Sequence, residues 1–289
     1  MGPNQHKFKE NPLVGFMRQP KIYVRLPSNG QFWPTGSLEP TETGEYPVYS
    51  MTAKDELMLK IPDALLNGQA VVDVIQHCMP NIKNAWSIPN IDLDAILIAI
   101  RIATYGETMK VPVKISDQEF EYDLDLRMLL DDLMSKVTWD EVLQITPELV
   151  VYVKPLDYRQ MSASAGKTFE SQKIISMVND TSLSESDKAR MFKEAIDKLN
   201  AITVDLVTTS IFKIDSSSGS TEEIRFIREF MDNVDKDIFD QIKSHIESLR
   251  EHNVLKPLVI NPTHEMLAQG IANAPIEIPL VFDPSTFFG

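Results

Sequence analysis

Alternating apolar and polar positions mark several short segments in the first half of the chain. Residues 21–26 alternate in this way, which predicts a half-buried strand, and a turn is expected at residues 28–30. Residues 108–115 and 120–126 alternate as well and predict a hairpin. Residues 149–154 are mostly apolar or β-branched and predict a buried strand. Because each segment is short, small antiparallel hairpins are expected.

Between these predicted strands, apolar residues recur at three- and four-residue spacing, which predicts helices. Thr52 and Asp55 have the pattern of a capping box, so a helix is expected from residue 53 onward. Another helix is predicted to begin behind one of the aspartates at 92 and 94 and to stop at Gly106. It is apolar on nearly every side, which predicts that other elements cover it all round. Further helices are predicted over residues 69–79, 127–135 and 139–144.

The second half of the chain is predicted to be mostly helical. Ser184 caps a long helix whose apolar stripe, within residues 192–206, is expected to face inward. The serine-rich residues 215–220 are expected to form a loop, and residues 254–260 and 276–282 a second hairpin. The predicted helices cover residues 157–178, 184–209, 221–233 and 235–251.

These elements predict an α+β fold class, with helices packed on small antiparallel hairpins and a helical insertion or bundle in the C-terminal half. The expected segments are an extended N-terminal arm at residues 1–20, an α+β domain at 21–155, a helical region at 156–252, and a C-terminal hairpin and tail at 253–289. The arm carries scattered apolar side chains that suit either packing on its own domain or docking on a partner.

Composition narrows the function classes. The chain has 289 residues, of which 43% are hydrophobic and 24% charged, values that suit a globular protein with a real core. Its net charge of -14 argues against a nucleic-acid surface, which needs clustered lysine and arginine, and favours protein partners. No apolar run approaches the roughly 20 residues that span a bilayer, and the N-terminus lacks the apolar region of a signal peptide. A cytosolic protein without a membrane span is therefore expected.

Arg101 is the one charge inside the apolar helix that stops at Gly106. An unpaired buried charge costs several kcal/mol, on the order of a domain's whole stability margin, so a carboxylate partner is expected. A structural ion pair is favoured over a catalytic or ligand-binding arginine, because no nucleophile or phosphate loop accompanies it. The candidate partners are Asp55, Glu56 and Asp94.

The remaining residues show no catalytic, cofactor-binding or metal-binding constellation. Residues 165–168, Ala-Gly-Lys-Thr, resemble the end of a phosphate-binding loop, but the required glycine five residues before Gly166 is replaced by Met161. The histidines lack ligand spacing, and the acidic runs lack the glycine and final glutamate of a calcium loop. The single cysteine, Cys78, excludes an internal disulfide and is expected to be a buried thiol. These observations predict that the protein is not an enzyme and needs no cofactor.

The stretch from residue 26 to residue 106 carries a family resemblance. Its specific pieces are MTAKDE at 51–56, PDALLNG at 62–68 and IAIRIATYG at 98–106. In this order they resemble the baseplate hub and hub-assembly proteins of T-even-like contractile-tail bacteriophages. Relatives often carry cysteine pairs at the tips of two hairpin-like segments. The equivalent tips here, residues 115–119 and 262–274, have none, so metal binding is not carried over.

The resemblance implies a role in building the central hub of the tail baseplate, as a hub subunit or as an assembly factor for other hub components or the tape-measure protein. It implies docking rather than bond chemistry, in the host cytoplasm during assembly, with the virion tail baseplate as a further location. The rival classes are an assembly enzyme that binds nucleotide through Lys167 and Thr168, and a cell-wall hydrolase of the tail. The expected partner contacts are large apolar side chains: Phe8 and Phe16 in the arm, the Phe32-Trp33 corner, and Phe287 and Phe288 in the tail.

Overall fold

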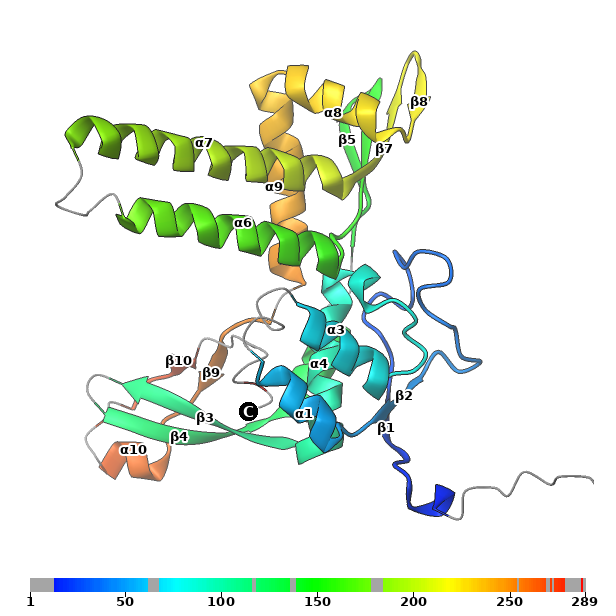
Figure 1. Ribbon diagram of the computed structural model, residues 1–289, viewed down its shortest axis with the longest axis vertical. Helices are drawn as coiled ribbons and strands as arrows, with labels where there is room; N and C mark the ends of the chain where they lie inside the picture. The colour runs from blue at the N-terminus through cyan, green and yellow to red at the C-terminus, as the bar shows by residue number, and fades with distance from the viewer. Residues whose placement is uncertain are drawn as a thin grey trace, which may run out of the picture.

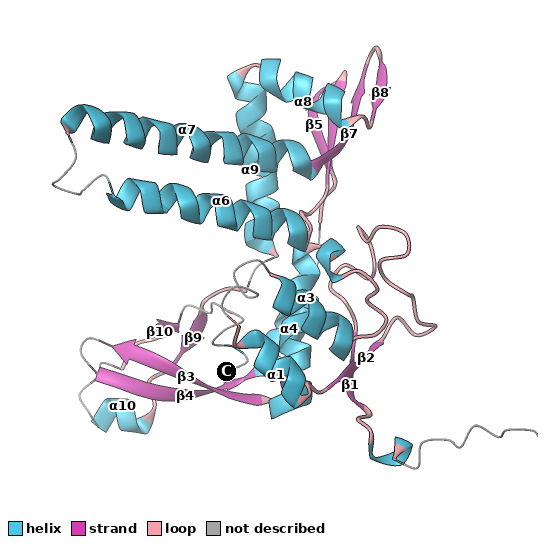
Figure 2. Cartoon of the chain, in the orientation of Figure 1, coloured by secondary structure: helices cyan, strands magenta, loops and turns pink. Residues whose placement is uncertain are grey.

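The structure is a computed structural model that describes residues 13–61, 68–115, 118–135, 139–177, 184–253, 255–268, 271, 273–278 and 287. Its helices and small antiparallel sheets confirm the predicted α+β fold class (Figure 1, Figure 2). In chain order the elements are η1 (Val14–Phe16), β1 (Pro20–Val24), β2 (Tyr46–Tyr49), α1 (Ala53–Leu59), α3 (Gln69–Cys78), η2 (Ala85–Ser87), α4 (Asn90–Tyr105), β3 (Thr108–Ile115), β4 (Gln118–Asp125), α5 (Leu126–Ser135), β5 (Val142–Thr146), β6 (Leu149–Val153), α6 (Tyr158–Met177), α7 (Glu185–Ser210), β7 (Ile211–Ser216), β8 (Gly219–Thr221), α8 (Ile224–Asn233), α9 (Lys236–His252), β9 (Leu258–Ile260), α10 (His264–Ala268) and β10 (Ile276–Ile278).

The main core surrounds α4, the helix predicted to be covered all round. Ile96, Ile98 and Ile100 are fully buried, and α3, α5, β1 and β2 pack against this helix. α4 begins at Asn90, slightly before the predicted aspartates, because Pro89 can precede a first helical turn without losing a needed hydrogen bond. The prediction of a covered central helix is confirmed.

The start of α1 is the predicted capping box. The Thr52 hydroxyl accepts from the amide of Asp55, and the Asp55 carboxylate accepts from the amide of Thr52 at 2.7 Å. Asp55 is buried, and its second oxygen lies 2.7 Å from Nδ1 of His77. Burial raises the pKa of this carboxyl, but hydrogen bonds from Thr52 and His77 outweigh burial, so its pKa lies below the ordinary value.

Asp92, in the first turn of α4, holds the turn that follows β1. Its carboxylate accepts from the Ser28 amide at 2.7 Å and the Ser28 hydroxyl at 2.5 Å, and from the Trp33 indole N–H at 2.7 Å. Burial raises the pKa of Asp92 to about 6, although the three hydrogen bonds act in the opposite direction. A fully buried carboxylate therefore ties residues 28–33 to the central helix.

An antiparallel sheet in the order β5-β6-β7-β8 forms a second core with α8 and α9. The helix predicted over residues 139–144 is wrong, because residues 142–146 form β5 and pair with β6. Leu143 and Ile145 pack against the second core from one face of the strand, so cross-strand pairing decided this segment. The segment 215–220, predicted as a loop, contains the end of β7, a tight turn and the start of β8.

The long helices α6 and α7 lie side by side as a hairpin that extends away from the rest of the chain (Figure 1). They are inserted between β6 and β7, which pair with each other across the insertion. The helical insertion predicted for the C-terminal half is therefore confirmed. The same pairing joins strands on either side of the boundary expected between residues 155 and 156.

The first turn of α6 is fixed to the main core. The amide of Tyr158 donates to the carbonyl of Ile88 at 2.9 Å, and the Tyr158 ring stacks on Trp86 with ring centroids 5.6 Å apart. Gly68, at φ +77°, lies against this stack, where an added Cβ would come within 3.1 Å of the Tyr158 hydroxyl and 3.2 Å of Ser162. This glycine is needed both for its conformation and for its size.

The second predicted hairpin is also present. β9 and β10 pair antiparallel, with Ile276 opposite Ile260. Together with β3, β4 and the short α10, which the sequence did not predict, they enclose a third small core that includes Phe120 and Met266. None of the helices in the described ranges combines the length and the apolar character that crossing a bilayer demands.

Candidate functional site

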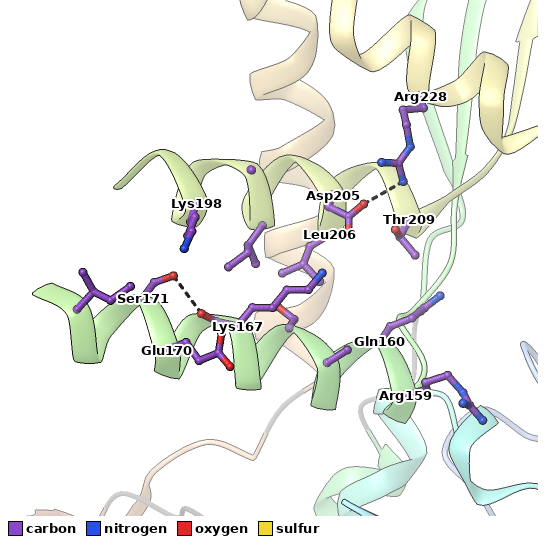
Figure 3. Close-up of a pocket in the computed structure, with 15 residues that line it drawn as sticks. Arg159, Gln160, Lys167, Glu170, Ser171, Lys198, Asp205, Leu206, Thr209 and Arg228 are labelled. Carbon is purple, nitrogen blue, oxygen red and sulfur yellow. Dashed lines mark hydrogen bonds and ion pairs between the residues drawn. The ribbon is translucent and has the colours of Figure 1, made fainter. Parts of the chain in front are cut away.

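A groove of about 730 Å³ runs between α6 and α7 of the helical hairpin (Figure 3). The apolar side chains of Ile174, Ile202 and Leu206 line it and are only half-buried. Ala163 on α6 and Ala201 on α7 also line it and are exposed. Because these residues are small, a guest could approach the backbones of both helices closely.

Basic side chains surround this apolar floor. Figure 3 shows Lys167 of α6 and Lys198 of α7 reaching into the space between the helices. Arg228 of α8 donates to Asp205 of α7 at 2.9 Å. The lining contains four basic and two acidic side chains, so its formal charge is +2 in a chain whose net charge is -14. These residues are Arg159, Lys167, Lys198 and Arg228, with Glu170 and Asp205.

The sequence did not predict this groove. It predicts that the apolar stripe of α7 faces inward, yet Ile202 and Leu206 line the groove and Phe192 is 47% exposed. The facing side of α6 offers small residues, among them Ala163 and Ser171, in place of a matching apolar stripe. This mismatch between two neighbouring helices is the signal that could have revealed an uncovered face.

The end of the N-terminal arm presents exposed apolar side chains beside the short helix η1. Leu13 is 59% exposed, Phe16 88% and Met17 52%. Phe16 was expected to contact a partner, and it lies where a partner could reach it. Phe8, the other expected contact in the arm, lies outside the described residues.

Arg18 joins this exposed segment to the body of the protein. Its guanidinium donates to the carbonyl of Ser50 at 2.7 Å and to the carbonyl of His77 at 2.5 Å. It also lies 5.4 Å from the centre of the Tyr49 ring, within range of a cation–π contact. Three contacts to separate residues therefore hold the base of the arm while its apolar side chains remain exposed.

The Phe32-Trp33 corner lies at the junction of the main and second cores. The indole of Trp33 is hydrogen-bonded to Asp92, and the ring packs against the main core. Phe32, at φ +66°, meets the edge of Trp139 with ring centroids 6.2 Å apart. Both rings are half-buried in contacts within this chain, so most of the expected contact surface is used internally.

Phe287, expected at a partner surface, is only 1% exposed and belongs to the main core. Its carbonyl accepts a hydrogen bond from Arg101, whose guanidinium lies 5.2 Å from the centre of the Phe287 ring. The same guanidinium lies 5.1 Å from the centre of the Tyr105 ring. The structure thus places this aromatic ring inside the protein. Phe288 lies outside the described residues.

Arg101 therefore meets a carbonyl and two rings where the sequence predicts a carboxylate. Asp55 is engaged by His77 at 2.7 Å, and Glu56 accepts from the Tyr105 hydroxyl at 3.1 Å. The Phe287 carbonyl accepts from one nitrogen of the guanidinium, and the two aromatic faces stabilise the cation without burying a second charge, while the buried Nε of Arg101 has no hydrogen-bond partner among the described residues. The sequence gives no signal that residue 287 returns to α4.

The residues that suggested nucleotide binding lie within α6. Backbone amides inside a helix bond to the preceding turn, so residues 165–168 cannot wrap a phosphate as a glycine-rich loop does. Within the described ranges, no group of three or more His, Cys, Asp or Glu side chains could hold a metal ion. Cys78 is buried, as predicted, and burial raises the pKa of its thiol to about 12.

Comparison with known protein families gives a match over most of the chain. A family described as T4 bacteriophage base plate protein matches residues 19–265, a span that runs from β1 into α10 and includes the whole helical hairpin. No curated protein and no solved structure gives a significant match. The family match confirms the resemblance of residues 26–106 to T4-like phage baseplate proteins and extends it over most of the chain. The protein belongs to the T4 bacteriophage base plate protein family.

Proposed function

We propose that this protein is a non-enzymatic subunit of the baseplate hub, or an assembly factor for the hub, that works by docking on other hub components or on the tape-measure protein. Membership of the baseplate family supports contacts with other tail proteins. Assembly of this kind takes place in the host cytoplasm and leads to the tail baseplate of the virion.

The observation that carries the docking role is the exposed apolar segment at residues 13–17, held to the body by Arg18. Each large apolar side chain buried against a partner contributes about 1.5–3 kcal/mol. Because Leu13, Phe16 and Met17 are exposed together, a partner that covers all three gains several times this amount. The anchored base lowers the ordering cost of binding, since part of the arm is already positioned.

The test is co-purification with hub and tape-measure proteins of the same phage, expressed together with this chain. The variant Leu13→Ser/Phe16→Ser/Met17→Ser should retain the wild-type unfolding temperature, because these side chains are exposed. The amount of partner that co-purifies with it should fall at least tenfold. Phe169→Ser is the matched control, because Phe169 is 63% exposed on α6, away from the arm, and its replacement should leave recovery of the partner unchanged. Full recovery of the partner by the triple variant would contradict the proposal.

Mass spectrometry of purified virions distinguishes the two forms of the proposal. A hub subunit is present in the finished particle at a fixed ratio to other baseplate proteins. An assembly factor is found with hub components in infected cells but is missing from virions.

A further inference from the structure

We infer that the groove between α6 and α7 is a docking site for an acidic amphipathic helix of a partner protein. This inference rests on the proposed docking function, but on a different surface from the N-terminal arm. Figure 1 shows the hairpin extending away from the body, so a partner helix can reach the groove from solvent.

The floor of the groove sets the apolar side of the guest. Ile174, Ile202 and Leu206 remain half-buried, and the exposed Ala163 and Ala201 leave room between them. A guest helix with apolar residues at i, i+3, i+4 and i+7 would bury these side chains and complete a three-helix packing. Along α6 the lining runs from 159 to 174, and at a rise of about 1.5 Å per residue this stretch is about 22 Å long, or roughly four helical turns.

The backbone of the groove favours a helix over an extended peptide. Both walls are helices whose backbone amides and carbonyls bond within the same helix, so they offer no strand edge. An extended guest would bury its own backbone groups without partners. A helix carries its backbone hydrogen bonds within itself, so it can enter an apolar groove at lower cost.

The charges of the groove favour acidic flanks on the guest. Lys167 and Lys198 extend into the groove, and in the described part of the chain neither forms an ion pair. Asp205 is already paired with Arg228 at 2.9 Å. A carboxylate on the guest would therefore meet two lysines that form no ion pair among the described residues, within a protein whose net charge otherwise repels acidic molecules.

The same charges argue against nucleic acid as the guest. Nucleic-acid binding requires many basic contacts to phosphates, whereas this groove has a balance of +2 and includes Glu170 and Asp205. The net charge of -14 adds long-range repulsion. A partner that presents carboxylates together with apolar side chains fits both the floor and the rim.

The test uses a fluorescent 16-residue peptide that is stapled into a helix, with leucines on one face and glutamates on both flanks. Its matched control carries lysines in place of the glutamates. Fluorescence anisotropy with the full-length protein should show binding of the acidic peptide, weakening as salt rises, and at least tenfold weaker binding of the basic peptide. Equal binding of the two peptides, or no binding of the acidic one, would overturn the inference.

Variants locate the binding. Lys167→Glu and Lys198→Glu should each weaken binding of the acidic peptide roughly three- to tenfold. Ala201→Phe should block binding, because the larger side chain fills the floor of the groove. Lys193→Glu is the matched control, because Lys193 is exposed on α7 outside the groove lining and makes the same charge change. Equal unfolding temperatures confirm that all four variants fold. If Lys193→Glu weakens binding of the acidic peptide as much as Lys198→Glu does, the groove is not the binding site.

The outcomes separate this inference from the proposed function. If the acidic peptide fails to bind while the arm variant still loses its hub partner, the groove assignment falls and the docking function stands. If wild-type protein forms a concentration-dependent dimer that Ala201→Phe abolishes, the groove binds a second copy of this chain, and the partner helix is overturned.

Discussion

Replacement of Phe287 by alanine should destabilise the isolated protein strongly. The ring is 1% exposed, and truncation of a buried phenylalanine costs about 3–5 kcal/mol. Loss of the contact with the Arg101 guanidinium, 5.2 Å from the ring centre, contributes within this range, because cation–π pairs are worth about 0.5–2 kcal/mol. A domain is stable by only about 5–15 kcal/mol, so this one side chain supports a large share of the margin.

The assay is thermal unfolding of the purified chain without any partner, measured by calorimetry. At about 2–4 °C per kcal/mol, Phe287→Ala should lower the midpoint by about 6–20 °C. Phe169→Ala is the control, because Phe169 is 63% exposed and its loss should change stability by less than about 0.5 kcal/mol. If Phe287→Ala unfolds within about 1 °C of wild type but no longer recovers a hub partner, the ring is a contact site and the reasoning from burial is refuted.

Three further substitutions test single contacts. The pKa of Asp55 lies below its ordinary value of 3.8, so near that pH the unfolded chain binds more protons than the folded chain, and the free energy of unfolding falls as the pH drops. In urea unfolding from pH 6 to pH 3, Asp55→Asn should therefore lose less unfolding free energy than wild type. Trp33→Phe removes one donor from the buried Asp92 carboxylate and should lower the unfolding free energy by about 1.5–3 kcal/mol in urea titration, whereas an unchanged midpoint would contradict the hydrogen bond. Gly68→Ala places a Cβ at φ +77° within 3.1 Å of Tyr158 and should cost about 1–3 kcal/mol in calorimetry, while a gain in stability would show that the turn can relax.

The elements that the sequence predicted well are those whose signals are local. The Thr52 and Asp55 capping box starts α1 as expected, and Gly106 ends α4 as expected. Both depend on residues within one turn of each other, so spacing along the chain is sufficient. The hairpin of β3 and β4 was found for the same reason, since its two strands follow each other directly.

The errors occur where distant segments decide the structure. Residues 139–144 are predicted as a helix, yet residues 142–146 form a strand because β6, which also pairs with β7 from beyond the helical insertion, offers an edge. Phe287 reads as an exposed tail residue, yet it is buried against α4, 186 residues earlier in the chain. Neither partner can be identified from a window of sequence, because the free energy is gained only after the chain has folded.

The same limit explains why the candidate sites differ from the expected ones. Large aromatic residues attract attention as contact residues, but Trp33 and Phe287 satisfy their rings inside the protein. Among the exposed apolar surfaces are the face between α6 and α7, two helices that are unequal in apolar character, and the arm segment around Phe16. An exposed apolar surface marks an interaction site only when the chain itself cannot cover it, and that is a property of packing. If the protein works by docking, as proposed, its contact surfaces can be found only after the residues of the core are known, and the sequence alone does not define that core.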